Sequence, residues 1–460
     1  MKVNSSIFKS YDIRGIYPND INKEVAYKIG KGFATFLINS LKKREIIVSL
    51  GQDMRLSSPI LKKEFKRGLI NSGINVVDIG LVSTPTLYFS VFNYNYDAGV
   101  QITASHNPKE YNGFKLVKNS ENGIIKIGKN SGMNILEDIV LKERFIKTNK
   151  KGKSIINKKV LNDEINKLIE FIDYKKIKKL KIVADAANAM LGIDLDALFK
   201  KLPVKLIKMN FKLDGRFPKH EANPLKFETL KDLQKKVIKE KADLGIAPDG
   251  DGDRVFFIDE KGKIIPASHI TALLSKELLR MFPKEKIAFD IRYIFTPKEI
   301  VLKEKGFPII TPVGHALISE KMREKNALFA GESSGHYFFR QTGFAESSLL
   351  VILLVLEIIS RENKPISKIL KPLISSFESG EINFELKDKK LIKNKFKILK
   401  EHYKNGKISL LDGLSIEYPD WRFNLRASNT EPLLRLNLEA KSKKILKEKQ
   451  KEVLSLLNSN

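Results

Sequence analysis

Short apolar runs that end in small or polar residues alternate along most of this chain with longer segments of helical periodicity. The short runs predict buried strands, at residues 46–50, 76–79, 99–103, 181–185, 244–248 and 286–290. The longer segments predict helices, at residues 22–41, 59–72 and 160–172. Strands alternating with helices are typical of an α/β fold with a mostly parallel sheet.

Three of the predicted strands share a local pattern, in which an apolar run reaches an aspartate and is followed by a loop and a helix. The aspartates are Asp53, Asp185 and Asp290. This weak repeat suggests three related α/β units. After residue 374 the pattern changes to short strands at 382–386, 408–411 and 433–438, with a basic helix from 441. That change predicts a smaller α+β domain at the C-terminal end.

We therefore predict four domains: three α/β domains with mixed, mostly parallel sheets and a C-terminal α+β domain. The predicted boundaries are 1–150, 151–257, 258–371 and 372–460. The lysine-rich stretch 147–159 is expected to connect the first two domains. The most apolar run, 349–359, is too short to span a bilayer and contains Glu357, so it predicts a buried core helix.

The composition narrows the possible partners. The net charge is +29, from 83 Lys and Arg against 54 Asp and Glu. Most of the surplus lies in lysine pairs scattered among apolar residues, which indicates a compositional bias, and a smaller part can attract an anionic small substrate. We therefore expect no nucleic-acid partner and no membrane partner. The absence of cysteine and of an apolar leader at residues 1–6 favours a cytoplasmic protein.

The first candidate site is Thr103-Ala-Ser-His-Asn-Pro108, directly after a predicted strand. Small residues allow close approach to a ligand, and proline stops regular structure. Ser105 is therefore expected to lie exposed at a strand end, where open α/β sheets bind ligands. A hydroxyl so placed can relay a transferred group covalently. The alternative is an ordinary polar turn.

The second candidate site is Asp249-Gly-Asp-Gly-Asp-Arg254. Alternate residues of an extended segment point the same way, so Asp249, Asp251 and Asp253 are expected to converge. Three carboxylates suit a hard divalent cation such as Mg²⁺, and without a cation they repel each other. Arg254 adds positive charge beside them. The alternative is a surface turn rich in Asp and Gly.

Two further segments carry polar groups at spacings that suit a sugar phosphate. In Gly331-Glu-Ser-Ser-Gly-His336, Glu332 and Ser334 point to one side if the segment is extended, and can hold neighbouring hydroxyls. In Arg426-Ala-Ser-Asn-Thr-Glu-Pro432, a guanidinium and hydroxyls can bind phosphate. Taken alone, each of these segments also fits a simple turn or hairpin loop.

Together these four segments resemble the motifs of the α-D-phosphohexomutases, in the family's order and over nearly the whole chain. They correspond to that family's phosphoserine, metal, sugar-binding and phosphate-binding loops, and the resemblance implies that the four domains surround a central cleft. The resemblance is greatest to members that act on mannose and glucose phosphates. It implies a reversible transfer of phosphate between C1 and C6 of a hexose, through an enzyme phosphoserine and a 1,6-bisphosphate.

The resemblance also implies roles for individual residues. Mg²⁺ is expected on Ser105, Asp249, Asp251 and Asp253. The candidate catalytic residues are Ser105, His106, Lys115, Arg254, His315 and His336. The candidate substrate-binding residues are Tyr11, Arg14, Arg292, Glu332, Ser334, Arg426, Ser428, Asn429, Thr430 and Arg435. Lys115 is the first candidate for proton transfer, provided that nearby charge lowers its pKa.

The expected partners are phosphorylated hexoses, with glucose 1,6-bisphosphate or the corresponding hexose bisphosphate as activator. The chain is expected to act as a monomer or homodimer. Three departures from the family pattern bear on the substrate: Ser333 where Met or Gln is usual, Arg292 where Lys is frequent, and Ala345-Glu346 in place of an acidic pair. The alternatives are a phosphoglucosamine mutase and, more remotely, an inactive sugar-phosphate-binding protein.

Overall fold

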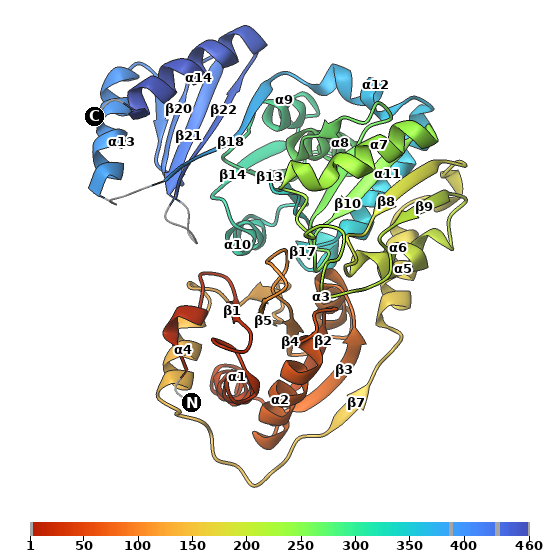
Figure 1. The fold of residues 1–460 in the computed structure, drawn as a ribbon, viewed down its shortest axis with the longest axis vertical. Coiled ribbons are helices and arrows are strands. Elements are labelled where there is room, and N and C mark those ends of the chain that lie inside the picture. Colours follow the sequence, from red (N-terminus) through yellow and green to blue (C-terminus); the bar gives the residue numbers. More distant parts are fainter. Residues whose placement is uncertain (1–2, 386–389, 428–432, 459–460) are drawn as a thin grey trace. The chain divides into compact units, whose positions relative to one another are not determined.

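The computed structural model describes residues 3–385, 390–427 and 433–458 (Figure 1). The chain divides into two compact units. The first contains residues 1–265 and 334–367, and the second contains residues 266–333 and 368–460.

The first sheet lies at the N-terminal end of the first unit, with strand order β1-β5-β4-β2-β3-β7 and β6 beside β5. The central strands run parallel, whereas β1, β5 and β6 pair antiparallel. The strands are β1 (Ile13–Ile16), β2 (Ile47–Gln52), β3 (Asn75–Leu81), β4 (Ala98–Ile102), β5 (Tyr111–Lys118), β6 (Ile125–Lys126) and β7 (Ser154–Ile156). β7 lies inside the stretch 147–159 that is expected to connect the first two domains, and its backbone extends the parallel edge of the sheet beside β3.

Alternation along the strands places this sheet between two helical layers (Figure 1). Val76 packs with α1 (Lys23–Leu41), α2 (Ser58–Asn71) and α4 (Met133–Leu141), while its neighbour Val77 packs on the other face with α3 (Thr84–Asn93). α1 begins where the side chain of Asn22 accepts from two backbone N–H groups of its first turn, as an N-cap does.

The second sheet of this unit has the order β12-β11-β10-β8-β9, with β10, β8 and β9 parallel and β10, β11 and β12 antiparallel. Its strands are β8 (Lys181–Asp185), β9 (Lys205–Met209), β10 (Leu244–Pro248), β11 (Val255–Ile258) and β12 (Ile264–Ile265). Its helices are α5 (Val160–Phe171), α6 (Leu191–Phe199) and α7 (Lys231–Glu240).

The remainder of the first unit consists of the antiparallel pair β16 (Tyr337–Phe339) and β17 (Ala345–Glu346), followed by α11 (Ser348–Glu362). Residues 349–356 of α11 are fully buried, as expected for a core helix. Across the described residues, no helix combines the length and the apolar character needed to cross a bilayer.

The second unit combines a parallel arrangement with an antiparallel sheet. β13 (Lys286–Asp290) lies between β14 (Phe307–Thr311) and β15 (Phe329–Gly331), with both pairs parallel. The helices of this part are α8 (Ala267–Met281), α9 (Phe295–Lys303) and α10 (His315–Lys325), and the short α12 (Ile366–Leu370) spans the boundary between the units.

The last sheet is antiparallel throughout, in the order β18-β22-β21-β20-β19. Its strands are β18 (Phe377–Glu385), β19 (Lys407–Ser409), β20 (Leu414–Glu417), β21 (Trp421–Ala427) and β22 (Leu433–Ala440), with α13 (Lys390–His402) and α14 (Lys443–Asn458). The mixed α/β sheets and the distinct C-terminal sheet confirm the predicted fold class.

Candidate active site

Ser105 lies in the loop that follows β4, held in a conformation that few residues other than glycine adopt. Its φ is +52°, and its backbone N–H donates to Thr103 Oγ1 at 2.9 Å. The expectation of an exposed serine is wrong, because only 1% of Ser105 reaches solvent. The loop Asp249–Arg254 covers it, so the hydroxyl lies inside a polar cluster.

Arg55 holds this loop in place through hydrogen bonds to its backbone. Its guanidinium donates to four backbone carbonyls, which belong to Ser105 (2.8 Å), Asn107 (2.6 Å), Pro108 (2.7 Å) and Tyr111 (2.9 Å). Asp53 pairs with the same side chain at 3.2 Å, and both side chains are fully buried. Sequence reasoning missed Arg55, although an arginine two residues after an aspartate at a strand end was a visible signal.

The aspartate loop converges through a tight turn and not through an extended segment. Gly252 has φ +80°, and the N–H groups of Gly252 and Arg254 donate to Asp249 Oδ1 at 3.1 and 3.2 Å. Gly250 comes so close to the serine loop that a Cβ there would lie 2.2 Å from the carbonyl oxygen of Ser105. The glycines therefore allow the two loops to meet.

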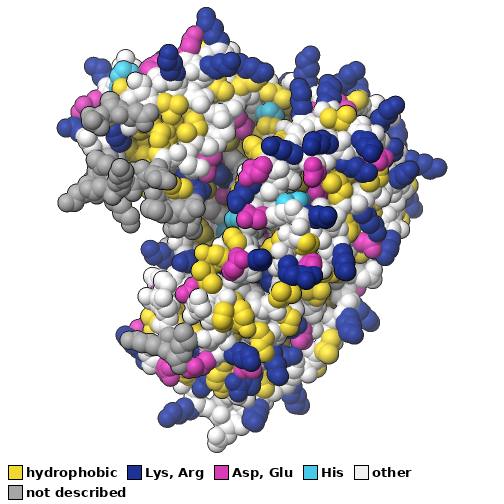
Figure 2. Space-filling view, in the orientation of Figure 1, with side chains coloured by type: hydrophobic (Ala, Val, Ile, Leu, Met, Phe, Trp, Pro, Cys, Tyr) yellow, Lys and Arg dark blue, Asp and Glu magenta, His cyan; other side chains and the backbone are white. Residues whose placement is uncertain are grey.

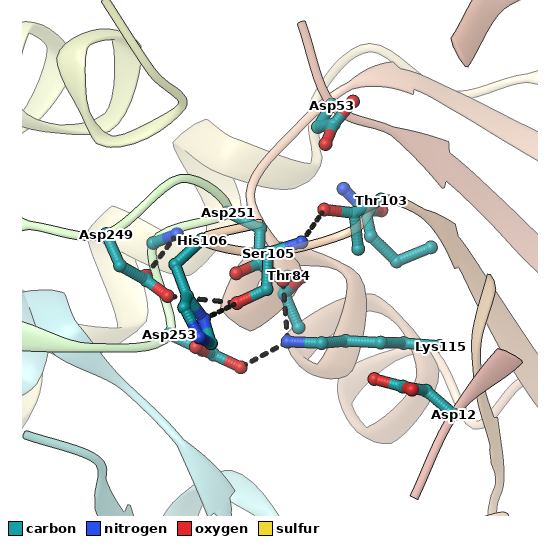
Figure 3. A network of polar contacts seen from close by, with 12 residues as sticks. Asp12, Asp53, Thr84, Thr103, Ser105, His106, Lys115, Asp249, Asp251 and Asp253 are labelled. Carbon is teal, nitrogen blue, oxygen red and sulfur yellow. Dashed lines mark hydrogen bonds and ion pairs between the residues drawn. The ribbon is translucent and has the colours of Figure 1, made fainter. Parts of the chain in front are cut away.

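The two loops are joined at the serine hydroxyl (Figure 3). Ser105 Oγ donates to Asp249 Oδ2 at 3.0 Å and lies 3.2 Å from His106 Nδ1. Burial lowers the pKa of His106 well below its ordinary value, and Arg254 and Arg14 lower it further. His106 is therefore neutral at physiological pH and offers a proton acceptor beside the hydroxyl.

Lys115 on β5 bridges two of the aspartates, with its Nζ 2.6 Å from Asp251 Oδ2 and 2.5 Å from Asp253 Oδ2 (Figure 3). Burial lowers the pKa of Lys115, but the two carboxylates outweigh burial and raise it above its ordinary value. The condition under which Lys115 is a candidate for proton transfer, a pKa lowered by nearby charge, is not met, because the nearest charges are negative. We call Ser105, Asp249, Asp251, Asp253 and Lys115 the serine–aspartate cluster.

The three aspartates provide a fit for a divalent cation. One oxygen from each lies within 4.8 Å of the others. Oδ1 of Asp251 is buried and accepts no hydrogen bond from any residue that the structure describes. Burial raises the pKa of Asp249, and the charges of Asp253 and Asp251 raise it further.

His336 contacts the cluster from the side of β16. Its Nε2 lies 3.3 Å from Asp253 Oδ1 and accepts from Arg254 Nε at 3.3 Å, and Ser334 Oγ lies 3.1 Å from its Nδ1. Residues 333 and 334 form a turn, so the extended arrangement considered for Glu332 and Ser334 does not occur.

Glu346 forms a buried ion pair with Lys126 beside this cluster. Glu346, Asp253 and His336 place their ligand atoms within 4.8 Å of one another. The sequence marked Glu346 as a departure from the family pattern but gave no partner for it.

Arg14 also lies beside the serine loop, whereas Tyr11 is half-buried in the segment before β1. Arg14 Nη1 donates to Asn107 Oδ1 at 2.7 Å, and its Nη2 pairs with Asp12 at 2.6 Å. Burial lowers the pKa of Arg14, but Asp12, Asp251 and Asp253 together raise it.

The second unit holds a separate group of arginines. Arg292 pairs with Asp290 (2.8 Å) and Glu332 (3.3 Å), and Glu332 also accepts from the N–H of Gly314 at 3.1 Å. Burial lowers the pKa of Arg292, but Asp290 and Glu332 outweigh burial and raise it. His315 is the first residue of α10 and is half-buried.

Arg426 and Arg435 lie directly opposite each other on β21 and β22. Glu381 on β18 pairs with both, at 3.2 Å from Arg426 Nη2 and 3.3 Å from Arg435 Nη1. We call Arg292, Arg426, Arg435 and Glu381 the arginine cluster. The candidates Ser428, Asn429 and Thr430 lie outside the described residues.

The positive surplus shows no concentration on the visible face. Figure 2 shows Lys and Arg side chains scattered over both units among acidic and apolar residues. This distribution agrees with a compositional bias.

Family models for four consecutive domains match nearly the whole chain. They are phosphoglucomutase/phosphomannomutase domains I, II and III, at residues 5–147, 162–262 and 266–377, and the C-terminal domain at residues 381–456. The chain therefore belongs to the phosphoglucomutase/phosphomannomutase family. It is an intramolecular phosphotransferase that moves phosphate between positions of a hexose.

Individual relatives agree with this assignment. A phosphomannomutase from Vibrio cholerae is 38% identical over 461 residues, and the match covers 98% of each chain. A phosphomannomutase from Methanocaldococcus jannaschii is also 38% identical, over 98% of this chain and 97% of its own. The crystal structure of a phosphoglucomutase/phosphomannomutase family protein from Burkholderia thailandensis has a TM-score of 0.88 at 31% identity and covers 99% of this chain and 97% of that chain.

Proposed function

We propose that this enzyme interconverts the 1- and 6-phosphates of mannose and glucose through a phosphorylated Ser105 and a hexose 1,6-bisphosphate. The observation that carries the proposal is the 3.0 Å contact between Ser105 Oγ and Asp249 Oδ2, inside a cluster that also holds Lys115. The relatives named phosphomannomutase support the choice of sugar.

Two transfers balance the reaction. Phosphorylated Ser105 gives its phosphoryl group to the free C6 hydroxyl of the hexose 1-phosphate, so the Ser105 O–P bond breaks and the C6 O–P bond forms. The proton of the C6 hydroxyl passes to the Ser105 oxygen that is released. After the bisphosphate has reversed its orientation in the site, the hydroxyl of Ser105 takes the phosphoryl group from C1. In this second transfer the C1 O–P bond breaks and the Ser105 O–P bond forms. The proton of Ser105 passes by way of Asp249 or neutral His106, which contact its Oγ, to the released C1 oxygen.

The residues of the cluster also fit Mg²⁺, which Asp249, Asp251, Asp253 and phosphorylated Ser105 would hold. Bound there, the cation neutralises charge on the transferred phosphoryl group. Lys115 keeps its proton beside Asp251 and Asp253, so it stabilises negative charge and does not act as a base. Arg254 and Arg14 add positive charge at the same loops.

The arginine cluster is proposed to bind the phosphate that is not being transferred, because guanidinium groups bind phosphate through paired hydrogen bonds. Glu332 is proposed to hold sugar hydroxyls together with Ser334, and Tyr11 is proposed to contact the substrate. His315 and His336 remain candidates for proton transfer.

A coupled assay tests the proposal, with Mg²⁺, a trace of glucose 1,6-bisphosphate, and the 1-phosphates of mannose, glucose and glucosamine. We expect turnover of mannose and glucose phosphates, and a loss of at least about a thousandfold in Ser105→Ala, because the covalent relay is removed. The matched control is Ser40→Ala on α1, whose hydroxyl donates to the carbonyl of Leu37.

Each outcome of this assay decides one part of the proposal. Intact-mass measurement of the resting enzyme should show one added phosphoryl group in wild type and in Ser40→Ala but not in Ser105→Ala. A preference for glucosamine 1-phosphate would keep the mechanism and replace the substrate. Full activity of Ser105→Ala would overturn the phosphoserine.

A further inference from the structure

Glu381 bridges two arginines that would otherwise repel each other. Arg426 and Arg435 are direct cross-strand partners, and like charges at such positions are unfavourable. Each carboxylate oxygen of Glu381 serves one of them, Oε2 for Arg426 and Oε1 for Arg435. The carboxylate thereby presents two oxygens to two guanidinium groups, as one face of a phosphate does.

The ion pairs of Glu381 with Arg426 and Arg435 are partly exposed to solvent. The Arg426 side chain is 4% exposed, whereas the side chains of Arg435 and Glu381 are 21% and 28% exposed. The carboxylate therefore lies above a buried cation, and an anion from solvent can reach the same guanidinium groups by displacing it. A partly exposed ion pair contributes little to stability, so such a displacement costs little.

Charged residues around the Glu381 bridge act on the same guanidinium groups. Burial lowers the pKa of Arg426, and Arg292 lowers it further, while Glu381 and Asp412 oppose this. Glu381 also contributes to the raised pKa of Arg292. The negative charge of Glu381 therefore acts on all three arginines, and removing that charge makes the site more positive.

We propose that Glu381 is a built-in competitor for phosphate, whose carboxylate occupies the anion position between Arg426 and Arg435 and weakens the binding of phosphate dianions. The inference rests on the proposed function, in which this cluster binds the phosphate that is not being transferred. A mutase must release each phosphate before the opposite end of the same intermediate can be bound, so an affinity held down by a resident carboxylate favours turnover.

A purely structural role for Glu381 predicts the opposite result. If the carboxylate serves to hold the two guanidinium groups in place, its removal disorders them and weakens phosphate binding. If it competes with phosphate, its removal tightens phosphate binding. The sign of the change in affinity therefore separates the two roles.

Titration calorimetry with inorganic phosphate on the full chain measures that sign directly. We expect Glu381→Gln to bind phosphate about tenfold more tightly than wild type, because one like charge is removed from the site. Glu381→Ala removes the same charge and serves as a second variant, and thermal unfolding checks that both variants fold. The matched control is Glu417→Gln, since Glu417 is 26% exposed and pairs with Lys298 at 3.3 Å.

Kinetics provide a second readout. Glu381→Gln should lower KM for the hexose phosphate by about tenfold and should also lower kcat, because release of the bound phosphate becomes slower. Unchanged or weaker phosphate binding in both Glu381 variants would overturn the inference.

Arg426→Gln separates this inference from the proposed function. If Arg426→Gln loses phosphate binding and the Glu381 variants do not tighten it, the competitor role fails and the phosphate site stands. If Arg426→Gln and Arg435→Gln both bind phosphate as wild type does, the arginine cluster is not the phosphate site, and both fail.

Discussion

The serine–aspartate cluster of the first unit and the arginine cluster of the second unit handle buried charge in opposite ways. In the first, one lysine pairs with two of three carboxylates, and Lys115, Asp251 and Asp253 are at most 5% exposed. In the second, three arginines share carboxylates, and Glu381 and Arg435 reach solvent. The first has a surplus of negative charge, which a cation can balance, and the second has cationic groups that an anion can take over.

The difference in support is equally clear. The serine loop and the aspartate loop are fixed by backbone contacts, such as the four carbonyls bound by Arg55 and the N–H groups bound by Asp249. The guanidinium groups of Arg426 and Arg435 project from paired strands and are held by a side chain that can be exchanged. The fixed geometry of the first cluster suits the proposed phosphoryl transfer, and the exchangeable contacts of the second suit the proposed reversible binding of phosphate.

The sharpest way to break this comparison is to remove a carboxylate from the serine–aspartate cluster. Asp251→Asn removes a charge that contacts both Lys115 and Thr84 Oγ1 (2.5 Å). We expect kcat to fall by about a thousandfold with little change in KM, because the loss falls on the transition state. Steady-state kinetics at saturating Mg²⁺ measure this change.

The matched control is Asp259→Asn. Asp259 is buried and accepts from the N–H groups of Lys261 and Lys263 in the hairpin after β11, outside the cluster. A kcat for Asp251→Asn within tenfold of wild type would contradict the assignment of the chemistry to this cluster.

A smaller effect is expected from a change at Arg55, which holds the serine loop through its backbone carbonyls. Arg55→Lys keeps the charge but replaces a planar guanidinium that donates to several carbonyls. We expect kcat to fall by about ten- to a hundredfold and the melting temperature to fall with it, since Ser105 loses its fixed position. The control Arg216→Lys alters an exposed arginine paired with Asp214 and should change neither quantity.

If Arg55→Lys lowers the melting temperature and leaves kcat unchanged, Arg55 stabilises the fold without positioning the serine. Retention of full phosphorylation of Ser105 in that variant would support the same conclusion.

The smallest effect is expected at a third group of buried charges, which lies outside both clusters. Thr86 Oγ1 donates to Glu164 at 2.6 Å, and Ser83 lies 2.9 Å from Thr86 and also bonds to Asp194. Burial raises the pKa of Glu164 to about 8, with a further contribution from Asp194, and raises the pKa of Asp194 to about 7. The unfolded chain ionises these groups near pH 4.

Because the folded pKa values are the higher ones, the folded state keeps protons that the unfolded state loses, and stability falls as pH rises from about 4 to about 8. The double variant Glu164→Gln/Asp194→Asn should therefore melt at a higher temperature than wild type at pH 8.5, and the difference should vanish below about pH 3.5, where the unfolded chain also keeps both protons. Melting curves across this range test the sign. Activity within twofold of wild type is the expected control, and a large loss would place the pair in the active machinery.

The sequence by itself determined the local structure and the chemical inventory of this protein. β8 and β13 lie at the predicted residues, and α1 and α5 lie within one residue of their predicted ends, because local periodicity and capping residues decide such elements. The four motifs supplied Ser105, the three aspartates and Arg426. Their spacing sufficed to predict a serine, a cation site and an anion site.

The tertiary structure decided what those residues can do. The burial of Ser105, its contact with Asp249 across 144 positions of the chain and the carbonyl contacts of Arg55 depend on distant segments. The pKa of Lys115 is raised because Asp251 and Asp253 face it, a relation that a local pattern does not contain. The role proposed for Glu381 likewise depends on its ion pairs with two arginines on other strands. Burial and electrostatic energy depend on distances in space. The sequence therefore shows which ionisable groups are present, and the fold decides their pKa values and their partners.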